Sequence, residues 1–166
     1  MRVTWTVLAA GLLGAAVGAM RAATRLDRLH VRTDAAWAAL DAALYRRAVA
    51  ASALDGSGSL RRAAHAALLA VPSVREDAEN ELGRMLSVLD RRGLEPARAS
   101  RLADAEQAVV IARRVYNDAV RDTRALRSRR LVRWLHLAGT AALPNYFEIV
   151  EPALPAYGLE LDGAGA

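Results

Sequence analysis

The chain has 166 residues, enough for one domain after a short N-terminal segment, and its formal net charge at pH 7 is +5. Apolar residues make up 54% of the chain and are mostly Ala, Leu and Val, without the alternating pattern of strands, so we expect an all-α protein. The absence of Cys excludes disulfides, thiolate metal sites and cysteine nucleophiles. Every basic side chain is Arg, and the arginines are interleaved with acidic residues, which is typical of a solvated helix surface.

The N-terminal segment is apolar: residues 3–20 carry no charge and lie between Arg2 and Arg21. As a helix it would be about 27 Å long, close to the hydrocarbon thickness of a bilayer. We therefore expect a transmembrane anchor over residues 1–21, with Trp5 at the interface; a cleaved signal peptide and a buried core helix are the alternatives. The arginines after the segment favour an uncleaved single-pass anchor in the cell membrane, with the N-terminus outside and the bundle in the cytoplasm; the inverted topology is a further alternative.

After the anchor, the first long helix is expected to continue from Arg21 to about residue 54. An apolar stripe at helical spacing supports it, formed by Leu26, Leu29, Trp37, Leu40, Leu44 and Ala48. The DGSGS segment at 55–59 is typical of a turn, and a short Ala- and Leu-rich helix follows over about 60–70.

Two more long helices are expected in the second half of the chain. Ser73 and Glu76 have the spacing of a capping box, which predicts a second long helix over about 73–92. Pro96 suits the first turn of a third long helix, over about 96–128.

The apolar stripes of these helices must be buried against one another. We therefore expect an antiparallel up-down-up bundle of three long helices plus short helical pieces over residues 22–150. Residues 151–166 are expected to be a flexible C-terminal tail.

Several segments resemble the LemA family, over about residues 22–150. The first long helix has Trp37, Asp41 and an Arg46-Arg47 pair in the order of the family's AW…D…RR segment. The third helix contains ARRVYNDAV at 112–120, similar to the family's ARR-x-YN-x-AV, and LPNYFEI resembles its closing P-x-x-F-E run. The resemblance implies a membrane helix followed by a bundle of long helices, in a family whose molecular function is uncertain.

These segments supply the candidate residues for an interaction surface or for contacts between helices. The candidates are Trp37, Asp41, Arg46, Arg47, Arg113, Arg114, Tyr116, Asn117 and Asp118. Arg114 and Asp118 are spaced to form an ion pair on one helix face, and Asp41 could hold an arginine of the third helix. Tyr116 and Asn117 either pack and hydrogen-bond inside the bundle or belong to a binding surface.

A second candidate is the basic patch at Arg127, Arg129, Arg130 and Arg133, within the Arg-rich segment 121–133. It suggests, as the alternative function, a peripheral binder of anionic lipid or nucleic acid. In an up-down-up bundle the patch would lie far from the membrane, and positive charge also suits a helix C-terminus. We therefore rank this function second and consider nucleic acid an unlikely partner.

No reaction chemistry is predicted. Segment 75–83 is superficially similar to the end of a Nudix hydrolase motif, but Asn80 replaces the second glutamate of the required pair, so we reject that interpretation. The chain has no GxSxG motif or Gly-rich phosphate loop, and its three His lack metal-ligand spacing, so we expect no enzyme activity, cofactor or metal.

The hypothesis is therefore a single-pass, membrane-anchored helical scaffold that binds an unidentified protein through its bundle. Gly14 and Gly18 form a GxxxG pattern in the anchor, and self-association is a further expectation.

Overall fold

The computed structural model describes residues 2–54, 58–129 and 142–150, apart from the side chains of residues 2–4, 7–9 and 12. These parts of the chain are helical, joined by turns and followed by one extended segment, and they contain no strand. The helices are α1 (Arg2–Ser52), α2 (Gly58–Leu69), the 3₁₀ turn η1 (Pro72–Val74), α3 (Arg75–Ser87) and α4 (Pro96–Arg127). The expected all-α helical bundle is confirmed.

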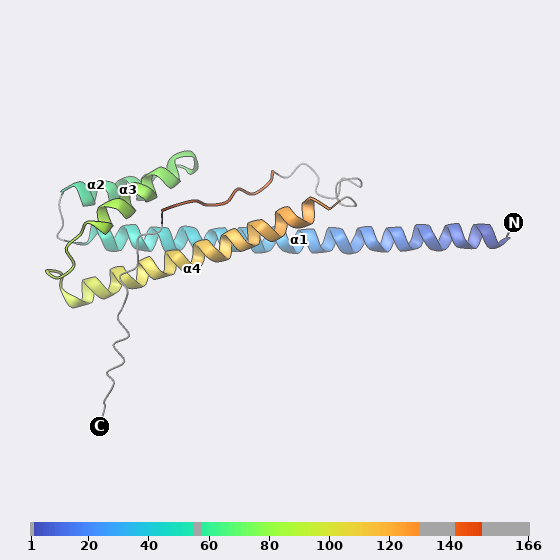
Figure 1. Cartoon of the computed structure of the whole chain (residues 1–166), viewed down its shortest axis with the longest axis horizontal. Coiled ribbons are helices and arrows are strands. Elements are labelled where there is room, and N and C mark those ends of the chain that lie inside the picture. The colour runs from blue at the N-terminus through green and yellow to red at the C-terminus, as the bar shows by residue number, and fades with distance from the viewer. Residues whose placement is uncertain (1, 55–57, 130–141, 151–166) are drawn as a thin grey trace, which may run out of the picture.

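Helix α1 is the axis of the molecule (Figure 1). Its 51 residues correspond to about 75 Å of helix, and they join the expected anchor and the expected first bundle helix without a break. No proline interrupts this stretch, and the alanines and leucines that dominate it favour the helix.

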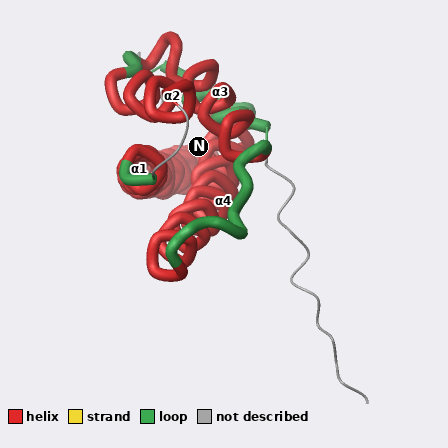
Figure 2. Tube along the Cα trace, turned by 90° about the vertical axis from the view of Figure 1, so that its left-hand side faces the viewer, coloured by secondary structure: helices red, strands yellow, loops and turns green. Residues whose placement is uncertain are grey.

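Helix α4 lies antiparallel along α1, as Figures 1 and 2 show. At its beginning, the Arg98 guanidinium donates a hydrogen bond to the carbonyl of Ala53, just after α1 ends. Near its end, Leu126 packs against Leu26 of α1. We call the end of the bundle near Leu26 proximal and the end near Ala53 distal.

Helices α2 and α3 form a short hairpin that packs on the distal half of α1. Its core consists of Ala48, Ala51, Leu54, Leu60, Ala63, Ala64, Ala67, Leu82, Leu86 and Leu102. The small side chains allow α2 to approach α1 closely, and leucines from α3 and α4 close the distal core.

The prediction of a second long helix over 73–92 is wrong at both ends, because α3 spans only Arg75–Ser87. Ser73 lies in η1, and α3 begins only at Arg75, with Val74 as an N-cap that has no capping hydrogen bond from a side chain. The Glu76 carboxylate, expected in a capping box, accepts a hydrogen bond from the Glu148 amide instead. A contact distant in sequence therefore takes the place of the local cap.

The topology also corrects the expected up-down-up order. The α2–α3 hairpin is too short to return along α1, so the chain is still at the distal end when α4 begins at Pro96. Helix α4 then makes the full return, and its C-terminal arginines lie at the proximal end. The expectation that the Arg-rich segment 121–133 lies far from the N-terminal segment is wrong for the described residues 121–129.

The middle of the bundle contains the main core between α1 and α4. The core there consists of Ala36, Leu40, Ala43, Leu44, Val109, Tyr116, Ala119, Val120, Phe147 and Ile149. One buried polar contact joins the helices: the hydroxyls of Thr33 and Thr123 lie 3.0 Å apart, and Thr33 also bonds to the Leu29 carbonyl. Because these groups are hydrogen-bonded, their burial carries little cost.

N-terminal to Ala22, α1 extends beyond the bundle (Figure 1). Trp5, Leu13 and Met20 are each about 70% exposed there, at 69%, 69% and 71%. Across the described part of the chain, none of the helices combines the length and apolar character needed to cross a membrane. Within the expected span over 3–20, the structure describes no side chain for residues 3, 4, 7–9 and 12.

Candidate functional site

Two candidate residues, Asp41 and Arg47, join a chain of charged groups between α1 and α3. Arg47 Nη2 lies 2.6 Å from Glu79 Oε2, and both side chains are buried. Arg75 pairs with Glu79 through Nε at 3.1 Å and with Asp41 through Nη2 at 2.9 Å. Asp41 thus holds an arginine of α3, whereas we expected one of the last long helix.

Trp37 and Tyr116 form an aromatic cluster with Phe147 from the C-terminal part of the chain. The Trp37 ring centroid lies 5.3 Å from that of Tyr116 and 5.8 Å from that of Phe147, in tilted and edge-on arrangements that aromatic pairs favour. The cluster therefore joins α1, α4 and the extended segment that follows.

That extended segment, residues 142–150, we call the strap. Phe147 and Ile149 are buried and their neighbours are exposed, as expected for extended backbone with one face on the core. The Asn117 side chain binds the backbone of Phe147 twice: Oδ1 accepts from its amide at 2.9 Å, and Nδ2 donates to its carbonyl at 3.1 Å. Tyr116 donates its hydroxyl to the Asn145 carbonyl at 2.8 Å.

Helices α4 and α3 hold the two ends of the strap. Arg124 of α4 donates to the Pro144 carbonyl at 2.8 Å, and its guanidinium lies 5.2 Å from the centre of the Tyr146 ring. On α3, Asn80 accepts a hydrogen bond from the Val150 amide. The YN pair of the third-helix motif therefore packs and hydrogen-bonds inside the bundle, the first of the two expected roles, and its hydrogen-bond partner is the backbone of the strap.

Burial raises the pKa of Tyr116 above its ordinary value. Asp34 and Glu76 shift the pKa in the same direction, and the positive charge of Arg124 opposes them. The neutral hydroxyl is the form that donates to the strap.

Of the other candidates of the third-helix motif, Arg114 and Asp118 are exposed on α4. Asp118 Oδ1 is 3.1 Å from Arg121 Nη2, so its ion pair runs toward the C-terminus of the helix. Arg113, by contrast, is half-buried.

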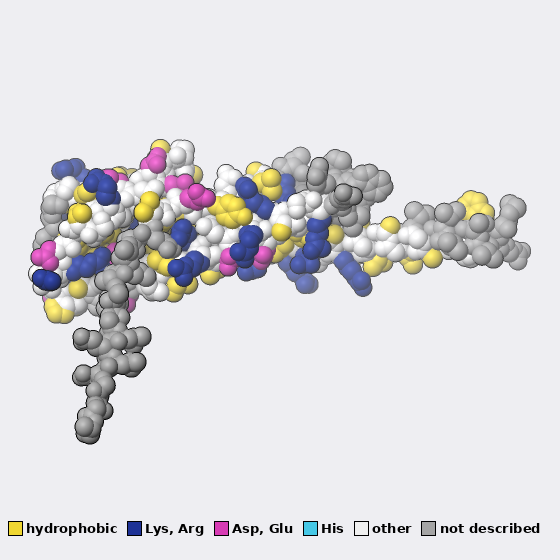
Figure 3. Space-filling view, viewed as in Figure 1, with side chains coloured by type: hydrophobic (Ala, Val, Ile, Leu, Met, Phe, Trp, Pro, Cys, Tyr) yellow, Lys and Arg dark blue, Asp and Glu magenta, His cyan; other side chains and the backbone are white. Residues whose placement is uncertain are grey.

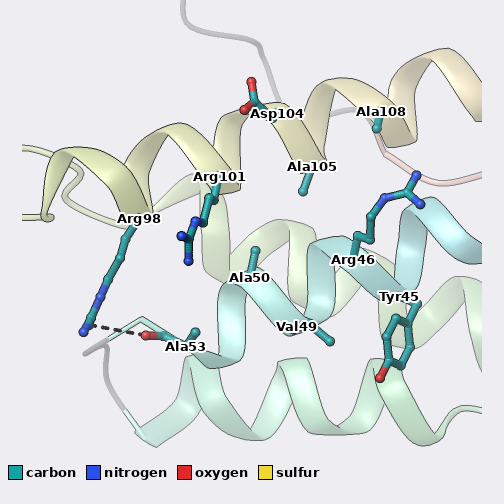
Figure 4. A pocket seen from close by; sticks show the side chains of 10 residues that line it. All are labelled: Tyr45, Arg46, Val49, Ala50, Ala53, Arg98, Arg101, Asp104, Ala105 and Ala108. Atoms are coloured by element: carbon teal, nitrogen blue, oxygen red, sulfur yellow. Dashed lines mark hydrogen bonds between the residues drawn. The ribbon is translucent and has the colours of Figure 1, made fainter.

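A groove of about 660 Å³ lies between α1 and α4 in the distal half of the molecule (Figure 4). Its lining consists of Tyr45, Arg46, Val49, Ala50, Ala53, Arg98, Arg101, Asp104, Ala105 and Ala108. Small apolar side chains, Val49, Ala50, Ala53, Ala105 and Ala108, form half of the lining and leave the groove between the two helices open. We call it the distal groove.

Arginines from both helices border the distal groove. Arg46 reaches from α1 toward α4, and Arg101 reaches from α4 toward α1 (Figure 4). Among the described residues, no carboxylate forms an ion pair with either guanidinium, although Asp104 also lines the groove. Positive charge over an apolar floor is the chemistry of a site for an acidic, amphipathic ligand.

The Arg46-Arg47 pair is therefore divided between two surfaces. Neighbouring helix positions are about 100° apart, so Arg47 enters the core toward Glu79 while Arg46 faces the distal groove. Of the pair, only Arg46 is available to a ligand.

The predicted basic patch is described in part. Arg127 donates to the Ala142 carbonyl at 3.1 Å and thereby holds the beginning of the strap, and Arg129 is exposed. Arg130 and Arg133 lie outside the described residues.

Several residues of these sites were not among the candidates. Glu79 lies one turn before Leu82 and two turns before Leu86, a spacing that places its carboxylate on the buried face of α3. Arg98 and Arg101 carry no local signal, because the groove they line exists only once α4 has packed beside α1.

The residues of the hydrolase-like segment are occupied by these structural contacts. Glu76 and Asn80 bind the strap, and Glu79 binds two arginines. No group of three or more His, Asp or Glu side chains suited to a metal ion is found within the described ranges.

Compared with known proteins, the chain matches no family model, no curated protein and no solved structure. The likeness to the LemA family thus remains a resemblance of sequence segments.

Proposed function

We propose that this chain is a LemA-like helical scaffold, tethered to the cell membrane by the N-terminal part of α1, which binds a partner protein in the distal groove. It acts by binding and carries out no reaction of its own. The observation that carries the proposal is the division of α1 into a bundled part and an uncovered apolar part within one continuous helix.

The tether is supported by the length and surface of the uncovered part. Residues 2–21 correspond to about 30 Å of helix, which matches the hydrocarbon thickness of a bilayer. The segment has no charged residue between Arg2 and Arg21, and its large apolar side chains, such as Leu13, are exposed. By the positive-inside rule, the arginines that follow favour a bundle in the cytoplasm and an N-terminus outside.

The partner is argued from the charge and shape of the distal groove. Arg46 and Arg101 lack carboxylate partners within the described residues, so an acidic ligand would neutralise them without displacing an existing ion pair. Ala50 and Ala105 leave room for side chains of the ligand between the two helices. An amphipathic helix with acidic residues along one edge fits both features.

The experiment that tests this function is site-specific photo-crosslinking in membranes. Tyr45 lines the groove and is 59% exposed, so a benzoylphenylalanine in its place keeps an aromatic ring at the groove edge. We expect one discrete crosslinked protein, with the crosslink mapping to an acidic amphipathic helix. Charge reversal by Arg46→Glu with Arg101→Glu should abolish it.

The matched control reverses two exposed arginines of α2, Arg61→Glu and Arg62→Glu, which lie outside the groove. This control should leave the crosslink unchanged. A crosslink that survives reversal of the groove arginines, or that is lost equally in the control, would contradict binding in the distal groove.

A further inference from the structure

At the proximal end of the bundle, two segments that carry arginines lie side by side, at the same height along the bundle axis. Leu126 of α4 packs on Leu26 of α1, and Ala22 and Leu29 of α1 pack against this pair. Because α4 runs antiparallel to α1, residues 127–129 lie beside the turn of α1 that precedes Leu26. The arginines at the end of α4 therefore join those at the beginning of the bundled part of α1.

Four arginines at this level have no described partner. Arg21, Arg25 and Arg28 of α1 and Arg129 after α4 are exposed, and no described residue forms an ion pair or hydrogen bond with their side chains. We call these four residues the proximal collar. Figure 3 shows basic side chains gathered where the bundle narrows to the single helix.

Neighbouring arginines, in contrast, are already neutralised. Arg32 lies 2.9 Å from Asp122, and Arg121 lies 3.1 Å from Asp118. Asp27 is the remaining acidic residue on the first turns of the bundled part of α1, and it is exposed. The proximal collar thus keeps a net positive charge.

The collar continues directly into the apolar surface of the uncovered helix. Val17 and Met20 share a shallow concave face of α1 with Arg21, Arg25 and Arg28. An apolar helix surface that changes to arginine within one or two turns is typical of a position at the boundary between hydrocarbon and lipid headgroups. Thr24, on the same face, bonds to the Met20 carbonyl and leaves no unpaired hydroxyl there.

We propose that the proximal collar binds the headgroups of anionic phospholipids in the leaflet at the base of the bundle. The proposal rests on the tether, because the tether places Arg21 at the membrane surface. Guanidinium groups bind phosphate oxygens in pairs, and arginines on two packed helices can hold more than one headgroup. The antiparallel return of α4 thereby fixes the bundle against the membrane at a second point, Arg129.

Lipid fits the collar better than nucleic acid because of what lies next to it. A nucleic acid would follow a groove or a flat basic face, whereas the collar borders exposed apolar residues such as Val17 and Met20. Those residues require an apolar neighbour, which the acyl chains supply.

The test uses the full chain in nanodiscs of phosphatidylcholine mixed with phosphatidylglycerol. Electron spin resonance of spin-labelled lipids measures the relative association of each headgroup with the protein. We expect phosphatidylglycerol to be preferred, with the preference falling as salt is added. The variant Arg25→Gln, Arg28→Gln, Arg129→Gln should reduce the preference by about fivefold for each removed arginine that contacts a headgroup, and by about a hundredfold if all three do.

The variant retains Arg21 and Arg32, so the charge that sets the direction of insertion is weakened but not removed. The matched control is Arg61→Gln, Arg62→Gln, Arg92→Gln, which removes the same charge from exposed positions in the distal half. The control should keep the preference. An unchanged preference in the collar variant, or an equal loss in the control, would overturn the proposal.

Separate experiments test the tether and the proximal collar. A chain that is extracted from membranes by alkaline carbonate contradicts the tether, and the collar is then tested by flotation with intact vesicles of the same two lipids. Flotation that depends on phosphatidylglycerol and is lost in the collar variant supports the collar, and its absence overturns it. RNA binding that is lost in the same variant, without a lipid preference, would assign the collar to nucleic acid instead.

Discussion

Arg47 of α1 and Glu79 of α3 form an ion pair of 2.6 Å inside the bundle, with side-chain exposures of 2% and 0%. This pair favours the observed register of the α2–α3 hairpin on α1, because Arg47 has a buried carboxylate beside it only in this alignment, whereas Glu79 also pairs with Arg75 of its own helix. Arg75 extends the pair to Asp41 near the surface. The hairpin in turn positions Glu76 and Asn80, which hold the end of the strap.

Removing one member of the buried pair should be strongly destabilising. Arg47→Met leaves Glu79 buried with Arg75 as its only described ion-pair partner, so we expect a loss of about 3–5 kcal/mol in the free energy of unfolding. Denaturant unfolding followed by circular dichroism measures this loss.

Two control variants distinguish the effect of breaking the buried ion pair from the effect of removing any arginine. Arg84→Met removes an exposed ion pair with Glu81 and should cost less than about 1 kcal/mol. The double variant Arg47→Met, Glu79→Met should recover much of the stability, because no buried charge is left unpaired. Equal losses in the Arg47 and Arg84 variants would contradict this account.

The strap should be released by a single change on α4. Asn117→Ala removes both hydrogen bonds to the Phe147 backbone, so the free energy of unfolding should fall by about 1–3 kcal/mol. Hydrogen exchange should show the Phe147 amide losing protection while the amides in the middle of α1 keep theirs. Gln107→Ala, at an exposed position of the same helix, should leave the Phe147 amide protected.

High pH should loosen the strap through Tyr116. Its folded-state pKa is raised by burial, so the unfolded chain loses this proton first and stability falls as the pH rises above the ordinary tyrosine pKa of about 10. Below that pH the contribution is fully present. Urea titrations across this range should show a steeper loss for the natural chain than for Tyr116→Phe, and parallel curves for the two would count against the assignment.

The antiparallel return of α4 can be tested by crosslinking, because the chain has no cysteine of its own. Leu26→Cys with Leu126→Cys should react with a short bismaleimide to give an intramolecular crosslink. Leu26→Cys with Leu102→Cys should not, because Leu102 belongs to the distal core. Crosslinking of the second pair and not the first would indicate the up-down-up order.

Local signals in the sequence predicted elements well. Pro96 correctly marks the beginning of α4, because proline fixes the backbone angle that a first helical turn needs and its own missing amide costs nothing there. The leucine and alanine spacing of α1 predicted its buried face, including Leu40 and Leu44. These features depend only on neighbouring residues.

Features set by distant contacts were predicted less well. The capping-box pattern at Ser73 was misleading because Glu76 binds the strap, and the strap comes from 72 residues later in the chain. The direction of α4 could not be derived from helix periodicity, because it depends on how far α3 extends along α1. The distal groove and the proximal collar both follow from that direction.

The measurement that tests the central claim most directly is alkaline carbonate extraction of membranes from cells that produce the full chain. If residues 2–21 of α1 cross the bilayer, as proposed, the protein stays in the membrane pellet. The same proposal predicts that Leu13→Arg with Val17→Arg, both exposed positions of the uncovered helix, moves the protein to the supernatant. Recovery of the natural chain in the supernatant would contradict the tether.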